Sequence, residues 1–422
     1  MNTTRRHPNY GMRTLTFAAV LAVCGACGSA DDPGEEVYGE WRSQTEAVGD
    51  TTIVRTVSGS VWGDTMQLVP ELELGELDGP PPFLFGRISS VDVDPEGRVL
   101  VVDAQAREVR AFSSAGEHEF TVGREGDGPG EFRNPDQARF TSDGGFVVRD
   151  LAGRFSLFAR DGSFEHVWSR ATGYSTNSPF YVNSGDEVLN PSLPDDLVSY
   201  RLDGTIADTM GMPTREYERE VLQVSANGGI ASYSIPFMPA EHWTMDRDGR
   251  VIFGISDRYA IERWEDDGRV LRIERTARRV PVSDAEVSQV REQMARSIRS
   301  QAGPEWRWDG PDIPNEKPAF QTLLAGSAGS IWVLRETASI EVDNPAWDET
   351  QPDRGFPTRW ERPIVADVFD ADGAYLGPVK APTSISWTFP HAIVSRDAIW
   401  AVVEHEQGHE QVVRFRVAPG QD

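Results

Sequence analysis

Two residue types are scarce in this sequence, cysteine and lysine. Only two of the 422 residues are cysteine, and both fall within the first 27 positions. The rest of the chain therefore has no thiol for a disulfide, a thiolate nucleophile or a cysteine-based metal site. Only Lys317 and Lys380 among the 41 basic residues are lysine, and no basic cluster offsets the formal charge of -26. Since an acidic surface repels phosphate backbones, we expect no nucleic-acid partner.

Long apolar runs are also scarce, and a short one stands near the amino terminus. Residues 15–23 are apolar except for one threonine, follow three arginines, and precede a small-residue segment that contains Cys24 and Cys27. This order is typical of an export signal and too short for a stable membrane anchor. The small residues before Cys27 resemble a bacterial lipoprotein signal, which predicts acylation at Cys27. Cys24 is the second candidate, and an ordinary secretory signal over residues 1–27 is the alternative.

Residues 28–50 are rich in Gly, Ser, Asp, Glu and Pro, with little apolar content. This composition predicts a flexible acidic tether between lipid and domain. Gly28, directly after Cys27, resembles lipoproteins sent to an outer membrane. We therefore expect a lipid-anchored monomer in the cell envelope, at the periplasmic face of the outer membrane or at the cell surface.

The remaining chain carries an internal repeat with two markers. The first marker is an aromatic residue four positions before a turn glycine, and a sixth aromatic stands near the carboxyl terminus. The aromatic positions are Phe112, Phe158, Tyr200, Trp264, Phe369 and Phe415. The second marker is an earlier turn, at Gly97, Gly144, Gly185, Gly249, Gly329 and a glycine-free Arg396-Asp397. Both markers occur in the same order, with short apolar runs between them.

Repeats of this length made of short strands predict an all-β fold, a six-bladed β-propeller over about residues 51–418. The last repeat supplies only three strands. We expect residues 51–57 or 66–74 to pair with it, because ring closure removes the open sheet edges.

Two insertions interrupt the repeats, at about residues 278–316 and 336–362. In the first, Ser283 and Glu286 form a capping box, and apolar residues follow at helical spacing. This predicts a helix over about residues 283–300, between blades four and five and docked on the propeller. The following Trp306 and Trp308 have two interpretations: an exposed binding surface, or packing that fixes the helix to the blades.

The segment Gly123–Pro135, with its Gly-Pro-Gly-Glu-Phe element, precedes the second repeat, and Val101-Val102-Asp103 lies in the first. Together with Phe112 and Phe158, these residues resemble the NHL-type repeat of six-bladed propellers. The similarity is greatest to the lipid-anchored propeller proteins of bacterial envelopes, and it is sharp only over residues 84–165. The resemblance implies the fold, which serves enzymes and passive binders alike.

Aligning the repeats places one residue of each blade near the start of its innermost strand. These residues are Ser90, Gln137, Ser178, His242, Thr322 and His391. We expect them to surround one mouth of the central channel, either as a ligand site or as the lining of a water-filled channel. His242 and His391 are the only imidazoles among them, and two histidines without a carboxylate make a weak zinc site. We therefore expect no cofactor, with zinc or calcium as the alternative.

Other candidate sites are weaker. His405 and His409 flank Glu406 on an expected hairpin loop, which favours a solvated turn over a metal site. Asp92 and Asp94 have the spacing of a calcium loop, but strands rather than helices surround them. No motif of a nucleophilic enzyme occurs. The expected function is a ligand-binding or protein-interaction scaffold. The alternative is a metal-dependent hydrolase or lyase, of the lactonase or amidating-lyase type.

Overall fold

The computed structural model describes residues 39–150, 153–170, 178–192, 196–212, 217–226, 228–351, 354–405 and 407–420. Cys27 and most of the expected tether lie outside these residues. The described chain is all-β apart from one α-helix, α1, and two short 3-10 helices, η1 (Pro81–Phe83) and η2 (Ser327–Gly329). Within these ranges no helix is long and apolar enough to cross a membrane.

The strands form successive antiparallel sheets in chain order. The first sheet contains β4 (Ile88–Val93), β5 (Val99–Asp103), β6 (Glu108–Phe112) and β7 (His118–Val122). The second contains β8 (Pro135–Phe140), β9 (Phe146–Asp150), β10 (Arg154–Phe158) and β11 (Phe164–Ser169). The third contains β12 (Tyr181–Val182), β13 (Val188–Ser192), β14 (Asp196–Tyr200) and β15 (Ile206–Gly211).

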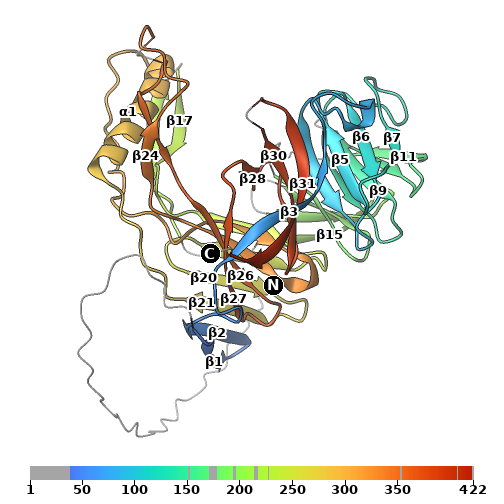
Figure 1. Cartoon of the computed structure of the whole chain (residues 1–422), viewed down its shortest axis with the longest axis horizontal. Coiled ribbons are helices and arrows are strands. Elements are labelled where there is room, and N and C mark those ends of the chain that lie inside the picture. Colours follow the sequence, from blue (N-terminus) through green and yellow to red (C-terminus); the bar gives the residue numbers. More distant parts are fainter. Residues whose placement is uncertain are drawn as a thin grey trace, which may run out of the picture. The chain divides into compact units, whose positions relative to one another are not determined.

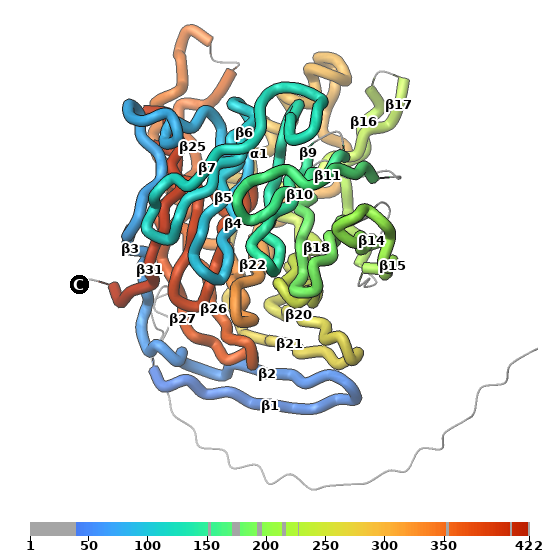
Figure 2. Tube along the Cα trace, turned by 90° about the vertical axis from the view of Figure 1, so that its right-hand side faces the viewer, coloured from blue at the N-terminus to red at the C-terminus, as the bar shows by residue number. Residues whose placement is uncertain are grey.

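The later sheets recruit strands from the amino-terminal side. The fourth contains β18 (Glu241–Met245), β19 (Val251–Ile255), β20 (Ala260–Trp264) and β21 (Val270–Arg275), extended by β2 (Thr51–Ser58) and β1 (Arg42–Val48). The fifth contains β22 (Phe320–Ala325), β23 (Ile331–Arg335), β26 (Ile364–Phe369) and β27 (Tyr375–Ala381). The last contains β28 (Ile385–Ser386), β29 (Ile393–Val394), β30 (Ala398–Glu404), β31 (Glu410–Pro419) and β3 (Met66–Leu74). The parallel pairing of β27 with β3 joins the fifth and last groups into one nine-stranded sheet. Figure 2 shows β1 and β2 beside β21.

The amino-terminal strands resolve the two pairings expected for the last repeat. Residues 66–74, as β3, pair antiparallel with β31, and Figure 1 shows these two strands side by side. Residues 51–58, as β2, instead pair in parallel with β21. Arg42–Val48, within the expected tether, forms β1 and pairs with β2. No sequence pattern predicted β1, because the strand is exposed along its whole length and is held by backbone pairing.

Hydrophobic clusters fill the layers between successive sheets, and they explain the aromatic marker. Phe158 of the second sheet packs in the cluster shared with the first, and Phe369 of the fifth packs in the cluster shared with the fourth. Phe112 of the first sheet belongs to a cluster shared with the last, which includes Val412. Trp264 is the exception, since it is exposed. Each buried aromatic therefore seals its own sheet against the preceding one.

The carboxylates of the first turn type bind their own backbone. Asp94 Oδ1 accepts hydrogen bonds from the N–H groups of Glu96 at 2.9 Å and Arg98 at 2.8 Å. Asp246 Oδ1 accepts equivalent bonds from Asp248 and Arg250, each at 3.0 Å. Of the two residues with calcium-like spacing, Asp94 thus stabilises the hairpin turn between β4 and β5, as the strand pattern predicts. Asp92 instead accepts from the Phe140 N–H of the neighbouring sheet.

The insertions pack against one another. α1 (Asp284–Ala302) has Ser283 as its N-cap, whose Oγ accepts from the Glu286 N–H at 3.1 Å, so the helix and its serine cap are confirmed. The Glu286 Oε1 accepts from Ser339 Oγ at 2.6 Å. Two further hairpins accompany it: β16 (Val221–Ala226) with β17 (Gly229–Ser234), and β24 (Ile340–Asp343) with β25 (Thr358–Glu361). We call residues 217–226, 228–238, 283–313, 339–351 and 354–361 together the insertion module (Figure 1).

The expectation that the helix docks on the propeller is wrong. Ile298 of α1 is fully buried in a cluster with Leu222 and Val224 of β16, Ile235 and Ile313. The helix therefore packs on the β16–β17 hairpin. No sequence pattern predicted this hairpin, which lies in the connection between the third and fourth sheets. Without it, the propeller was the only apparent partner for the apolar face of the helix.

Candidate ligand-binding cavity

The first strands of the sheets lie against one another. β4 contacts β8 and β29, β8 contacts β12, and β22 contacts both β18 and β29. Side chains from several sheets can therefore meet in one cavity.

Three of the residues expected at the channel mouth line a common cavity. Ser178, Thr322 and His391 line a space of about 630 Å³ together with Tyr181 and Trp243. The three side chains come from sequence positions far apart, and the repeat alignment alone predicted their convergence. These residues line the first cavity of the candidate site.

The other three have different surroundings. The Oγ of Ser90 accepts from Arg139 Nη1 at 3.4 Å, and the Oε1 of Gln137 accepts from the Phe180 N–H at 2.9 Å. Both side chains are buried, so each supports a neighbour. The His242 ring packs on Phe320, with 5.3 Å between centroids, and burial lowers its pKa to about 4. None of the three lines the cavities described in this subsection.

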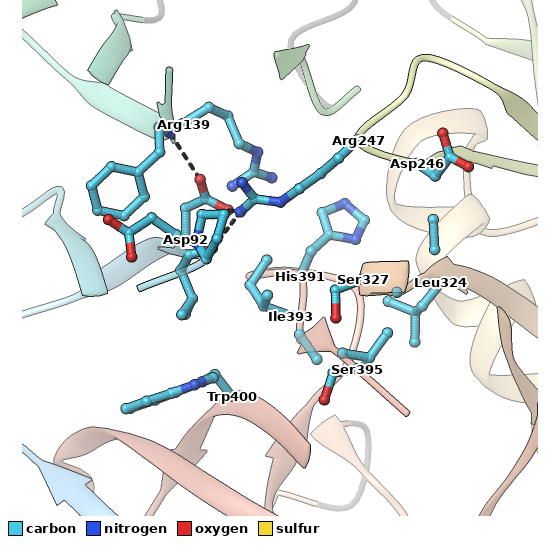
Figure 3. Close-up of a pocket in the computed structure, with 18 of the residues that line it drawn as sticks. Asp92, Arg139, Asp246, Arg247, Leu324, Ser327, His391, Ile393, Ser395 and Trp400 are labelled. Carbon is cyan, nitrogen blue, oxygen red and sulfur yellow. Dashed lines mark hydrogen bonds and ion pairs between the residues drawn. The ribbon is translucent and has the colours of Figure 1, made fainter. Parts of the chain in front are cut away.

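A second cavity of about 530 Å³ adjoins the first (Figure 3). Pro179, Tyr181, Thr244 and His391 line both spaces, so they lie between them. Five residues that line the second cavity stand two positions after one of the six aligned residues, which is the strand period that returns a side chain to the same face. They are Asp92, Arg139, Thr244, Leu324 and Ile393. They were not among the residues expected at the channel mouth, although adding two to the six expected positions gives these five and Phe180, which does not line the cavity.

Arg139 is the least compensated charge of this cavity. Its Nη1 donates to Val91 O at 3.1 Å, Ala138 O at 3.2 Å and Ser90 Oγ at 3.4 Å. Across the described residues, Nε and Nη2 have no hydrogen-bond partner, and no carboxylate lies within ion-pair distance. Burial lowers the pKa of Arg139, and the charge of Asp92 opposes that shift.

Arg247 reaches the same region from the turn between β18 and β19. Its Nη2 donates to Val93 O and lies 3.4 Å from Asp92 Oδ1. The other oxygen of Asp92 accepts from the Phe140 N–H at 2.9 Å. Figure 3 shows both guanidinium groups beside Asp92, so two cations here face one carboxylate.

The groups between the two cavities are uncharged at neutral pH. Burial raises the pKa of the Tyr181 hydroxyl, so the phenol stays protonated. Burial and the nearby charge of Arg139 lower the pKa of His391 to about 4. Both side chains therefore offer hydrogen bonds without charge.

The wall facing the arginines is mainly apolar. Leu324, Ile393 and Trp400 line it, with Ser327 and Ser395 beside them, and Figure 3 shows them opposite Arg139 and Arg247. Leu324 and Trp400 are buried. The cavity thus has one cationic side and one apolar side.

The remaining candidates do not join this site. Trp306 and Trp308 pack in the cluster of the insertion module, and Trp308 Nε1 donates to Pro311 O at 2.9 Å. This favours their packing role, although the helix they hold lies on the β16–β17 hairpin. The rings of His405 and His409 stack with centroids 4.5 Å apart, and Glu406 lies outside the described residues. Where the chain is described, no three His, Cys, Asp or Glu side chains are grouped to hold a metal ion.

Comparisons with known proteins give a distant likeness in fold. No protein-family model matches the chain, and no curated protein sequence matches it. Among solved structures, virginiamycin B lyase from Staphylococcus aureus is similar with 12% identity and a TM-score of 0.43, covering 84% of this chain and 100% of that one. A member of the DUF4221 family from Bacteroides vulgatus is similar with 11% identity and a TM-score of 0.47, covering 85% of this chain and 99% of that one. These neighbours are β-propeller-like, and no function is transferred from similarities this low.

Proposed function

We propose that the chain is a six-bladed β-propeller of the cell envelope that binds a small organic ligand in its central cavity. Six successive groups of antiparallel strands support the blade count. A cluster shared by the last and first sheets, which contains Val412 and Phe112, supports closure of the ring. β3 supplies the outer strand of the sixth blade, and α1 then falls between blades four and five.

Ligand binding rests on one observation, the uncompensated guanidinium of Arg139 in the cavity wall. A charge taken out of water is costly unless another group binds it. Perturbed charged groups in a cavity are more often functional than such groups elsewhere. The volume of about 530 Å³ lies within the range of small-molecule sites, roughly 300–1,000 Å³.

The other functions considered for this fold have less support. A protein-interaction role through Trp306 and Trp308 has less support, because both side chains pack against the hydrophobic cluster of the insertion module and are partly buried. A metal-dependent hydrolase or lyase needs further ligands beside His242 or His391, and the described residues supply no such group. Ligand binding is therefore the function that the cavity supports best.

A substitution that fills the cavity tests the proposal. Ser327 lines the cavity and is exposed, so Ser327→Trp places a large side chain there with little effect on folding. Asp266→Trp adds the same side chain to an exposed turn between β20 and β21 that does not line this cavity and is the control. We expect at least one member of a library of organic acids, amines and neutral solutes to raise the melting temperature of the wild type and of Asp266→Trp. The same compound should leave Ser327→Trp unchanged, and a library with no compound of this behaviour would contradict the proposal.

The lipid anchor at Cys27 is proposed from the signal pattern of residues 1–27 and has a separate test. Cys27→Ser should give a species that no longer fractionates with membranes, whereas Cys24→Ser should still fractionate with membranes. The reverse result would place the lipid on Cys24, and retention of both variants in the membrane fraction would exclude lipid anchoring at a single cysteine.

A further inference from the structure

We infer that the ligand of the central cavity is an organic monocarboxylate, held by Arg139 and Arg247 at its charged end and by an apolar wall along its body. The inference rests on the proposed function, since it assigns the chemistry of the same cavity. It follows from the balance of charge, the geometry of the donors and the apolar wall.

Most charges that line the cavity already have partners. Asp94 lies 3.8 Å from Arg98 Nη1, and Asp246 Oδ2 lies 2.8 Å from Arg250 Nε. At the rim, Glu96 pairs with Arg160 and Arg414 pairs with Glu71, while the exposed Asp397 accepts a hydrogen bond from Ser395. The inner charges that remain are those of Arg139, Arg247 and Asp92.

This inner group carries one net positive charge. Asp92 is shared, since it pairs with Arg247 and accepts the Phe140 N–H. His391 adds no charge at neutral pH. A ligand with one negative charge therefore completes the balance. A phosphate monoester, with a charge of about -1.5 to -2, would exceed it and would face the nearby Asp94 and Asp246 carboxylates.

The available donors suit a carboxylate. All the hydrogen bonds of Arg139 come from Nη1, so Nε and Nη2 remain for a ligand within the described structure. A guanidinium group offers parallel N–H donors that match the two oxygens of a carboxylate. Arg247 is half-exposed and lies beside Arg139, so it adds a second cation at the same end.

The apolar wall determines the rest of the ligand. Leu324, Ile393 and Trp400 stand opposite the arginines, where a small inorganic anion would leave them uncovered. A carboxylate with an aliphatic or aromatic body packs on this wall and removes from water the surface that Ile393 still exposes. The expected ligand is thus amphipathic, with one charge at one end.

The test uses four probes with the same alkyl chain: octanoate, octanamide, octylamine and octyl phosphate, with acetate as the probe without a body. We expect isothermal titration of the mature chain to show octanoate binding, with the other four at least tenfold weaker. Arg139→Met should weaken octanoate binding at least tenfold and octanamide binding little. Arg247→Met should weaken octanoate binding several-fold, and Arg139→Lys should restore part of the affinity lost in Arg139→Met.

Two controls separate the inference from the proposed function. Arg269→Met removes an exposed arginine paired with Asp267 and should leave octanoate binding unchanged. Circular dichroism and the melting temperature show whether Arg139→Met is folded, and Arg247→Met at a half-exposed position provides the second test. Octanamide or octylamine could bind as tightly as octanoate and lose that binding in Ser327→Trp. This result would overturn the inference that the ligand is a carboxylate, but it would leave the proposed cavity site intact. Tighter octyl phosphate binding would replace the carboxylate by a phosphate. If neither these probes nor the library compounds bind with sensitivity to Ser327→Trp, both proposals fail.

Discussion

Asp367 and Arg139 are both charged residues on β-strands, but their surroundings differ. Asp367, between the fourth and fifth sheets, is fully buried and accepts hydrogen bonds from the hydroxyl groups of Tyr259 and Tyr375, each at 2.7 Å. Arg275 Nη1 lies 2.5 Å from it and Arg335 Nε 3.6 Å. Arg139 bonds backbone carbonyls and one serine, and it faces a cavity.

The difference separates a structural charge from a binding charge. The Asp367 carboxylate is surrounded by donors, so the protein itself satisfies it and the group joins two sheets. The Arg139 guanidinium keeps unused donors toward the cavity, so an external group must satisfy it. Substitutions at the first should therefore change stability, and substitutions at the second should change binding.

The largest effect is expected for Asp367→Asn. The change leaves Arg275 and Arg335 in the core without the carboxylate between them. Breaking a buried ion pair by removing one partner costs about 3–5 kcal/mol in the free energy of unfolding. Urea unfolding of the mature chain measures the loss. The control is Asp372→Asn, an exposed position in the turn after β26, which should change stability by less than about 0.5 kcal/mol.

Asp367 should also make the free energy of unfolding depend on pH, by an amount close to the loss expected for Asp367→Asn. The arginines and tyrosines around Asp367 hold its pKa below the usual value, against the effect of burial. A lowered folded pKa means that the contribution to stability is present above the unfolded pKa of about 3.9 and is lost as pH falls through the folded pKa. The difference in unfolding free energy between wild type and Asp367→Asn should be constant above about pH 5 and shrink below about pH 4. A difference that grows on acidification would contradict this assignment.

A smaller loss is expected for Tyr259→Phe. The change removes one hydroxyl donor from Asp367 and keeps the ring that packs on Phe320. A hydrogen bond to a charged group contributes about 1.5–3 kcal/mol, which urea unfolding should detect. Tyr233→Phe removes a hydroxyl that donates to Gln301 at the surface and should cost less than about 1 kcal/mol. Equal losses in the two variants would show that the hydrogen bond to Asp367 contributes no more to stability than a surface hydrogen bond.

The smallest effect on stability is expected for Arg139→Met. No ion pair is lost, and removing a partly desolvated charge offsets the loss of its hydrogen bonds, so the change should be about 1 kcal/mol or less. Differential scanning calorimetry without ligand gives the comparison with Asp367→Asn. A loss as large as that of Asp367→Asn would make Arg139 a structural residue and remove the basis for the ligand site.

The repeat markers predicted much of the fold because they have a packing function. Phe158 and Phe369 each fill a layer between sheets, so the spacing between the aromatic residue and the turn glycine recurs wherever an aromatic residue packs between two sheets. The helix after Ser283 was also predictable, because its cap and apolar stripe are local. The strand β1 was not, since its exposed residues carry no burial pattern.

The site was predictable in part. The alignment found Ser178, Thr322 and His391 because first strands begin at equivalent positions. The alignment did not identify Asp92 and Arg139, which stand two residues after Ser90 and Gln137, because only one position on each strand was compared. The partner of α1 could not be found either, because Leu222 and Ile298 are distant in sequence and nothing local links them.

The sequence by itself determined the strands of the six repeats and their order, the closing pair of β3 and β31 as one of two alternatives, and the capped helix. Those features follow from local patterns of burial, turns and caps. Only the tertiary structure decided which of the two amino-terminal strands completes the last sheet, where the helix packs, and which charges find partners. Asp367 and Arg139 have no distinguishing mark in the sequence, because the satisfaction of a charge depends on groups that approach from other strands.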